Sequence, residues 1–153
     1  MLYLWISTSW SAGPLSNADN SILSSSVNST SLKEEILQEA ETRPMGPEDC
    51  TQIIRIDPLD IPAYVRRGFA HLSLGEYQQA LEDSNKAIIL SFNQTTAHSW
   101  LSQAYAQRGD AHQALGNSNE AIENYQKSLD IAPNDDLQAK LVGLKQKSSP
   151  NQA

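Results

Sequence analysis

Residues 63–75 read AYVRRGFAHLSLG, and residues 104–116 read AYAQRGDAHQALG. The two stretches lie 41 residues apart, and at the same offset Ala80 matches Ala121 further along the chain. Self-similarity at a fixed offset is the signature of stacked supersecondary units. The sequence therefore predicts a repeat protein, in which each unit covers the apolar side of its neighbour.

The glycines of the two stretches predict where helices end and where they touch. Each copy contains two runs of apolar residues at helical spacing. Gly75 and Gly116 lie where the first run stops, and a left-handed conformation there costs glycine nothing. Gly68 and Gly109 fall inside the first runs, where glycine costs about 1 kcal/mol relative to alanine. We therefore expect a neighbouring helix to pack too closely at both places for a β-carbon.

This pattern resembles the tetratricopeptide repeat, a helix-turn-helix unit of about 34 residues. The resemblance starts the first full copy at Ile61 and the second at Ser102. The sequence departs from the family pattern at Ser84, Phe92 and Ser128, which replace an aromatic residue, a proline and an alanine. The residues that match the family's packing places are Tyr64, Gly68, Ala80 and Ala87 in the first copy and Tyr105, Gly109, Ala121, Tyr125 and Pro133 in the second.

The resemblance implies an all-α fold, a short right-handed helix-turn-helix solenoid with a C-terminal capping helix. A cap is expected because the last unit would otherwise expose its apolar side to water. Leu137, Leu141 and Leu144 share one helical face and suit that role. The expected helical domain covers residues 31–147, with a partial repeat at 31–60, full repeats at 61–94 and 95–135, and the capping helix at 136–147.

The region between the two copies is about seven residues longer than the family unit predicts, which is close to two helical turns. Trp100 and Leu101 continue the apolar stripe upstream of the second copy. This continuation predicts an elongated first helix, with Thr95 or Thr96 as its N-cap. The alternative is a loop from Asn93 to Ser99 that leaves Trp100 as a lone anchor.

The ends of the chain differ in character from the repeats. Ser and Asn dominate residues 7–31, which hold few large apolar side chains and no periodicity. Such a segment cannot bury enough surface to offset its ordering entropy. We expect residues 1–30 to form a disordered leader and residues 148–153 to form a frayed tail. A helix is predicted over residues 47–56, after a break around Pro44.

The charge and hydropathy of the chain exclude two classes of partner. The sequence carries 11 basic and 18 acidic residues, a net charge of -7, which repels phosphate backbones and anionic membrane surfaces. The apolar run Met1–Ile6 is far shorter than the roughly 20 residues that span a bilayer. We therefore expect neither a nucleic acid nor a membrane as partner.

No pattern in the sequence indicates catalysis, a cofactor or a metal. Cys50 is the single cysteine, so no intramolecular disulfide and no cysteine-rich metal site can form. His71 and His112 hold equivalent places about a repeat apart, and packing between helices is the preferred interpretation over a shared metal site. The sequence contains neither a glycine-rich phosphate loop nor a Gly-x-Ser-x-Gly turn. We expect no enzyme activity, no cofactor and no bound metal.

The resemblance implies a concave groove, lined by the first helices of the repeats, that binds an extended or helical peptide. Some family members hold a carboxylate there with lysine and asparagine, but Val65, Phe69 and Gln103 occupy those places here. A clamp for acidic peptide ends is therefore not expected. The implied groove residues are Val65, Arg66, Phe69, Leu72 and Ser73 in the first copy and Gln103, Ala106, Gln107, Asp110 and Gln113 in the second.

Together these features predict a protein-protein interaction adaptor that binds a peptide or a partner helix in the groove. Whether the partial repeat covers Phe69 stays open at this point. Two other functions also stay open: a homodimer formed through the helix around Trp100, and a regulatory fragment of a larger enzyme. Both copies contain the motif Arg-Gly-x-Ala-His-x-x-Leu-Gly, which resembles bacterial members of the family. This resemblance favours the cytoplasm as the location of the protein.

Overall fold

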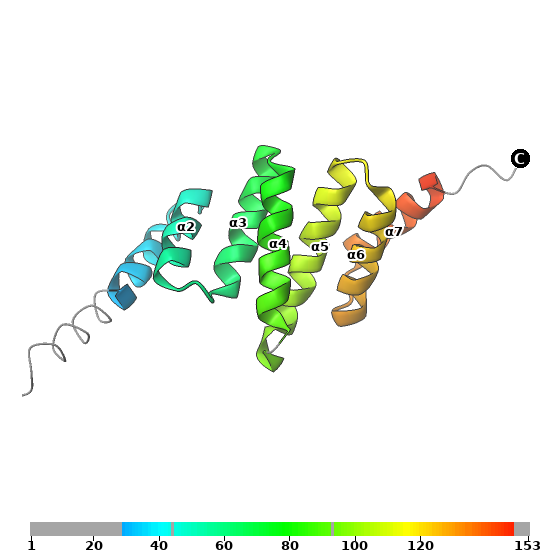
Figure 1. Cartoon of the computed structure of the whole chain (residues 1–153). Coiled ribbons are helices and arrows are strands. Elements are labelled where there is room, and N and C mark those ends of the chain that lie inside the picture. Colours follow the sequence, from blue (N-terminus) through cyan, green and yellow to red (C-terminus); the bar gives the residue numbers. More distant parts are fainter. Residues whose placement is uncertain (1–28, 44, 93, 149–153) are drawn as a thin grey trace, which may run out of the picture.

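The chain folds into a row of antiparallel helices, with the two ends of the described chain at opposite ends of the row (Figure 1). The computed structural model describes residues 29–43, 45–92 and 94–148, and within them it contains helices and no strand. The elements are a helix over residues 29–39, α2 (Pro47–Ile56), α3 (Ile61–Leu74), α4 (Tyr77–Ser91), the short 3-10 helix η1 (Thr95–Ala97), α5 (His98–Ala114), α6 (Ser118–Ile131) and α7 (Asp135–Ser148).

The helices pack in two layers, which makes the molecule a solenoid. Each helix from α2 to α7 packs on the next one along the chain. In addition α3 packs against α5, whereas α4 and α6 both pack on α5 rather than on each other. We therefore call the layer of α3 and α5 the inner layer, and the layer of α4 and α6 the outer layer. This arrangement confirms the predicted all-α helical repeat fold.

The helix ends follow from the residues that the repeat places there. Asp60 caps α3, because its side chain accepts a hydrogen bond from the Ala63 backbone amide at 2.7 Å. Gly75 and Gly116 have φ angles of 78° and 83°, in the left-handed region. The backbone amide of the residue after each glycine donates a hydrogen bond to a histidine carbonyl, at 2.8 Å in the first repeat and 2.9 Å in the second. The predicted role of both glycines is confirmed.

The first helix of the second repeat is elongated as predicted, but the α-helical extension starts at His98, about one turn rather than two before Ser102. α5 has 17 residues and begins at His98, directly after the turn of η1. The alternative, in which a loop leaves Trp100 as a lone anchor, is therefore wrong at His98 and Ser99, which are helical, whereas Asn93 lies outside the described residues. The predicted threonine cap is also wrong, because Ala97 is the residue that precedes α5 and no side chain caps the helix. A threonine cap is not needed because η1 continues directly into α5. Within η1 the Ala97 amide donates a hydrogen bond to the Gln94 carbonyl at 3.1 Å.

The partial repeat contains a first helix as well as α2. That helix runs from residue 29, two residues inside the expected leader, because Ser29 and Thr30 form its first turn, where hydroxyl side chains are well accommodated. Ile36 is buried in one cluster with Ile53 of α2 and Ala63 of α3. The rest of the expected leader, and the expected tail beyond α7, lie outside the described residues.

The last helix closes the array in the way expected of a cap. The Asn134 side chain accepts a hydrogen bond from the Leu137 amide at 2.8 Å, which fixes the start of α7. Leu137, Leu141 and Leu144 are buried in one cluster with Tyr125 of α6. No helix among the described residues has the length and apolar character needed to cross a membrane.

Candidate functional site

The inner layer of the solenoid contains a cavity of about 420 Å³ between the first helices of the two full repeats. α3 forms one wall of the cavity and α5 forms the other. Met45, which precedes α2, also lines it. We call this cavity the α3–α5 groove. Its lining residues are Met45, Val65, Arg66, Phe69, Trp100, Gln103 and Gln107.

The exposed surface of the α3–α5 groove is mainly apolar. Phe69 is 64% exposed, and Met45 and Trp100 are half-buried. The partial repeat therefore leaves Phe69 uncovered. The Arg66 guanidinium lies 5.7 Å from the centre of the Trp100 ring, within the range of a cation–π contact. Among the described residues that line the groove, Arg66 is the only charged one, so the groove offers apolar area beside a positive charge.

Gln107 joins the two repeats beneath the groove. Its side chain is buried, and Nε2 donates a hydrogen bond to the Val65 carbonyl at 2.7 Å. Oε1 has no hydrogen-bond partner among the described residues. The side chain fits because residue 68 is glycine: a β-carbon on Gly68 would lie 3.3 Å from Oε1. Gln107 thus fixes the spacing of the two walls.

Five of the ten predicted groove residues line the α3–α5 groove, and Leu72 does not. Val65, Arg66, Phe69, Gln103 and Gln107 are the five. Leu72 is half-buried and packs against the cluster that lies between α4 and the end of α5. Its place in the repeat pattern indicates the inner face, but the α3 helix turns this side chain toward α4.

Three of the four remaining predicted residues, Ala106, Asp110 and Gln113, lie in a more polar part of the inner layer. Ala106 and Asp110 line a separate cavity of about 380 Å³, between α5 and the start of α7. Asp110 accepts hydrogen bonds from the Tyr125 hydroxyl at 2.7 Å and from Lys140 at 2.9 Å. Gln113 lies next to the same tyrosine hydroxyl, at 2.6 Å. Ser73 is exposed, and its hydroxyl donates to a backbone carbonyl of its own helix.

Two groove residues were not among the predicted ones, Met45 and Trp100. Trp100 lies three residues before Gln103 on α5, and this spacing places both on one helical face. Once α5 was extended upstream, this spacing could therefore have identified Trp100 as a groove residue. Met45 precedes α2 and follows a proline-containing break, so no periodicity in the sequence could place it.

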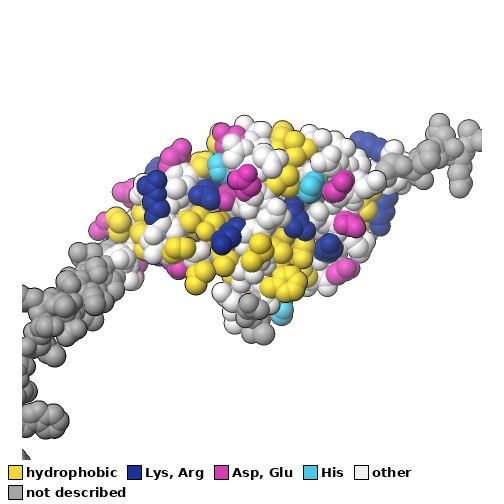
Figure 2. Space-filling view, viewed as in Figure 1, with side chains coloured by type: hydrophobic (Ala, Val, Ile, Leu, Met, Phe, Trp, Pro, Cys, Tyr) yellow, Lys and Arg dark blue, Asp and Glu magenta, His cyan; other side chains and the backbone are white. Residues whose placement is uncertain are grey.

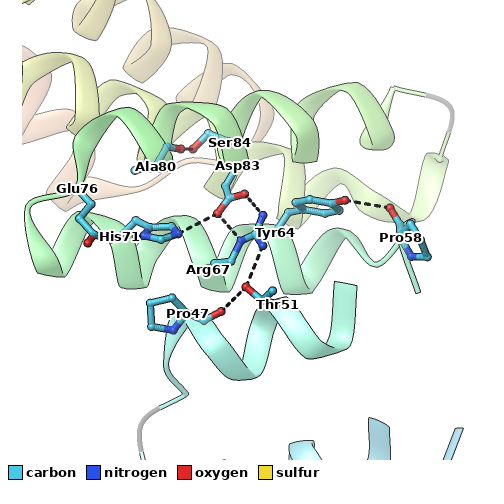
Figure 3. A network of polar contacts seen from close by, with 10 residues as sticks. All are labelled: Pro47, Thr51, Pro58, Tyr64, Arg67, His71, Glu76, Ala80, Asp83 and Ser84. Carbon is cyan, nitrogen blue, oxygen red and sulfur yellow. Dashed lines mark hydrogen bonds and ion pairs between the residues drawn. The ribbon is translucent and has the colours of Figure 1, made fainter. Parts of the chain in front are cut away.

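A polar network joins α2, α3 and α4 (Figure 3). Arg67 donates two hydrogen bonds to the buried Asp83 carboxylate, at 2.9 and 2.7 Å, and a third to the Thr51 hydroxyl at 3.0 Å. The His71 ring lies between two carboxylates, with Nδ1 2.6 Å from Glu76 and Nε2 3.8 Å from Asp83. The interpretation of His71 as a packing residue between helices therefore fits its contacts.

Most of the predicted packing residues are buried between the repeats. Tyr105 is half-buried and Pro133 is exposed. The buried ones are Tyr64, Gly68, Ala80, Ala87, Gly109, Ala121 and Tyr125.

Neither cysteine chemistry nor a metal ligand set was found in the described part of the chain. Cys50 is fully buried in α2, and burial raises the pKa of its thiol to about 11, so the thiol stays protonated at neutral pH. No group of His, Cys, Asp and Glu side chains in the described residues is arranged to hold a metal ion.

Comparison with known proteins identifies the repeats. The family model for the tetratricopeptide repeat matches residues 60–134. This match spans α3 to α6 and includes the α3–α5 groove apart from Met45. No curated protein matches the chain.

Several solved structures have the same fold. The Arabidopsis OM64 TPR domain is 23% identical with a TM-score of 0.63, and the match covers 78% of this chain and 96% of that domain. The first TPR of Spaghetti (RPAP3), bound to an HSP90 peptide, is 25% identical with a TM-score of 0.64, covering 80% and 94%. The second TPR domain of human RPAP3, in complex with an HSP70 peptide, is 26% identical with a TM-score of 0.58, covering 78% and 94%. The chain belongs to the tetratricopeptide-repeat family.

Proposed function

We propose that this protein is an interaction adaptor that binds a peptide or a partner helix in the α3–α5 groove. One observation carries the proposal: Phe69, at 64% exposure, borders a cavity of about 420 Å³ together with Trp100. An exposed aromatic residue beside a cavity is typical of a site that binds an apolar side chain of a partner. The proposal gives the protein no reaction of its own and assigns it to the cytoplasm.

The peptide complexes of two relatives support this proposal. The first TPR of Spaghetti (RPAP3) is bound to the HSP90 peptide SRMEEVD, and the second TPR domain of human RPAP3 is in complex with the HSP70 peptide SGPTIEEVD. The fold of this chain covers nearly the whole length of both domains. Binding of a peptide is therefore within the repertoire of this fold.

The groove of this chain favours an apolar anchor over an acidic peptide end. Val65 and Phe69 stand where some family members carry cationic or amide side chains, and Arg66 is the only cation among the described lining residues. Covering Phe69 and Trp100 stabilises a complex by about 25 cal/mol per Å² of apolar surface. We expect the partner segment to contribute a bulky apolar side chain, with an acidic residue near Arg66.

Selection from a random peptide library against the full chain, followed by titration of the selected peptides, tests this proposal. Phe69→Asp is expected to weaken binding at least tenfold, because a buried aromatic anchor contributes about 2 kcal/mol or more. Leu74→Asp is the matched control, since Leu74 lies on the same helix and is 63% exposed but does not line the groove. Circular dichroism checks that both variants fold.

Two results would contradict the proposal. Peptides that bind the wild type and Phe69→Asp equally well would place binding outside the groove. Peptides that lose affinity equally in Phe69→Asp and Leu74→Asp would indicate a non-specific effect of added charge.

A peptide ending in EEVD is expected to bind no better than its scrambled version.

A further inference from the structure

A second cavity lies on the opposite side of α5 from the groove. It measures about 500 Å³ and lies between the C-terminal ends of α4 and α6, over the first turns of α5. None of its lining residues lines the α3–α5 groove. We call it the α4–α6 pocket. The lining residues used below are Phe92, Leu101, Tyr105, Lys127, Asp130 and Ile131.

The extra length of the second repeat produces this pocket. His98 and Leu101 belong to the part of α5 that exceeds the usual unit, and both line the pocket. This added turn contributes His98 and Leu101 to the pocket between the ends of α4 and α6, and with Tyr105 it makes α5 the floor of the pocket. Leu101, Tyr105 and Ile131 are half-buried and provide apolar walls.

Two large apolar side chains are exposed near the C-terminal end of α4, and one of them, Phe92, lines the pocket. Phe92 is 75% exposed and Ile89, one turn earlier on α4, is 65% exposed. Figure 2 shows hydrophobic side chains gathered on this face of the molecule, over the C-terminal end of α4. Phe92 occupies the place of a proline in the repeat pattern, so repeat packing does not account for it. A projecting phenyl ring and an apolar pocket therefore lie side by side on one surface.

The pocket is lined by one positive and one negative side chain, so the pockets of two copies can pair their charges. Lys127 and Asp130 lie one turn apart on α6 and both line the pocket. Asp130 has no ion pair among the described residues and accepts a hydrogen bond from Gln126 at 3.1 Å. Lys127 is 3.9 Å from the exposed Glu123, a weak contact of one helical turn. Two α6 helices that cross antiparallel would bring each Lys127 to the other copy's Asp130.

We infer that the α4–α6 pocket is the interface for a second copy of this chain, related by a twofold axis. The twofold axis places Phe92 of each copy in the pocket of the other, and pairs Lys127 with Asp130 twice. A twofold contact uses one patch on both copies, and this patch contains both the projection and the cavity that receives it. The interface leaves the α3–α5 groove of each copy open, so the association is separate from the proposed peptide binding.

Sedimentation equilibrium of the full chain over a range of concentrations tests the inference. The measurement is made at physiological salt, because each copy carries a net charge of -7 and the repulsion is then screened beyond about 8 Å. We expect a reversible dimer, and we expect Phe92→Asp to weaken it at least about tenfold. Leu74→Asp is the matched control, with comparable exposure on a surface away from the pocket, and should leave the dimer unchanged.

Charge reversal tests the antiparallel pairing independently of Phe92. Lys127→Glu alone and Asp130→Lys alone place like charges opposite each other twice, so each should weaken the dimer about tenfold or more. The double variant restores opposite charges at both contacts and should recover the wild-type dissociation constant. All four residues of this pairing are on the surface, so the fold is retained, which circular dichroism verifies.

Three results would overturn the inference. A wild-type chain that stays monomeric at all concentrations leaves the pocket to a different protein. A dimer that resists Phe92→Asp but is lost with Trp100→Ala places self-association on the inner layer. A double charge reversal that stays as weak as the single variants excludes the antiparallel crossing of the α6 helices.

Discussion

The two full repeats share a backbone but fill the space beside their buried glycine differently. In the second repeat the Tyr125 ring packs on Gly109, so closely that a β-carbon there would lie 2.5 Å from two ring atoms. In the first repeat Ser84 holds the tyrosine's place, and the space beside Gly68 is filled by Gln107 from the next repeat. Equivalent glycines therefore have different neighbours, and the first repeat depends on the second.

The same two repeats also differ in buried charge. Asp83 of the first repeat accepts two hydrogen bonds from Arg67, whereas its counterpart Asn124 accepts one from Arg108 at 2.7 Å. Burial lowers the pKa of Arg108, which forms no ion pair with a carboxylate among the described residues. The charged pair is therefore a property of the first repeat alone. The comparison shows that the equivalent glycines keep the same backbone in both repeats, whereas the side chains around them determine the local stability of each repeat.

The largest expected difference between the repeats is at the two glycines. Gly109→Ala should destabilise the fold by about 2–3 kcal/mol, because the fully buried Tyr125 ring has no room to move. Gly68→Ala should cost less than about 1 kcal/mol, because its nearest contacts are 3.3 Å away and alanine gains about 1 kcal/mol of helix propensity. Urea unfolding followed by circular dichroism measures both. Equal losses would contradict the difference in packing.

The charged pair should give the next largest effect. Asp83→Asn should destabilise the fold by about 2 kcal/mol, because it weakens two hydrogen bonds to the Arg67 guanidinium. The reciprocal change Asn124→Asp should cost less: it adds a charge partner for Arg108 but removes the hydrogen bond from Nδ2 to the Glu120 carbonyl. Chemical unfolding of both variants compares them. A larger loss for Asn124→Asp would show that the second repeat relies on its amide more than the first relies on its carboxylate.

A smaller effect is expected from the tyrosine hydroxyl. Burial and the hydrogen bond to Asp110 raise the pKa of Tyr125, so the hydroxyl stays protonated and acts as a donor. Tyr125→Phe should cost about 1 kcal/mol, the typical contribution of one hydrogen bond. Ser84→Ala in the first repeat should cost less, since the serine hydroxyl bonds only to a carbonyl of its own helix. Thermal unfolding of the pair measures the difference, and a costlier Ser84→Ala would contradict it.

The smallest effect on stability is expected at the groove. Phe69→Asp should change the free energy of unfolding by no more than about 0.5 kcal/mol, because Phe69 is largely exposed. Urea unfolding of this variant beside the wild type checks the value. A loss of several kcal/mol would mean that Phe69 supports the fold, and its effect on binding would then need another explanation.

The sequence was sufficient for the features that depend on backbone and periodicity. The positive φ angles of Gly75 and Gly116, and the extension of α5, were predicted because glycine and apolar spacing report directly on helices. The direction of individual side chains was harder. Leu72 was expected in the groove and packs toward α4, and Gln107 lines the groove as expected but is buried and donates to the Val65 carbonyl. Repeat position gives the helix face, but the neighbour that fills each space comes from another repeat.

Site-specific photo-crosslinking tests the central claim, binding in the α3–α5 groove, most directly. A benzophenone side chain is placed at Gln103, which is exposed and lines the groove, or at Glu82, which is exposed on α4. Each protein is irradiated with a peptide selected from the library, and the products are read by mass spectrometry. The account predicts a cross-link from position 103 and none from position 82. Cross-linking from position 82 with none from position 103 would place the bound peptide on the outer layer and contradict it.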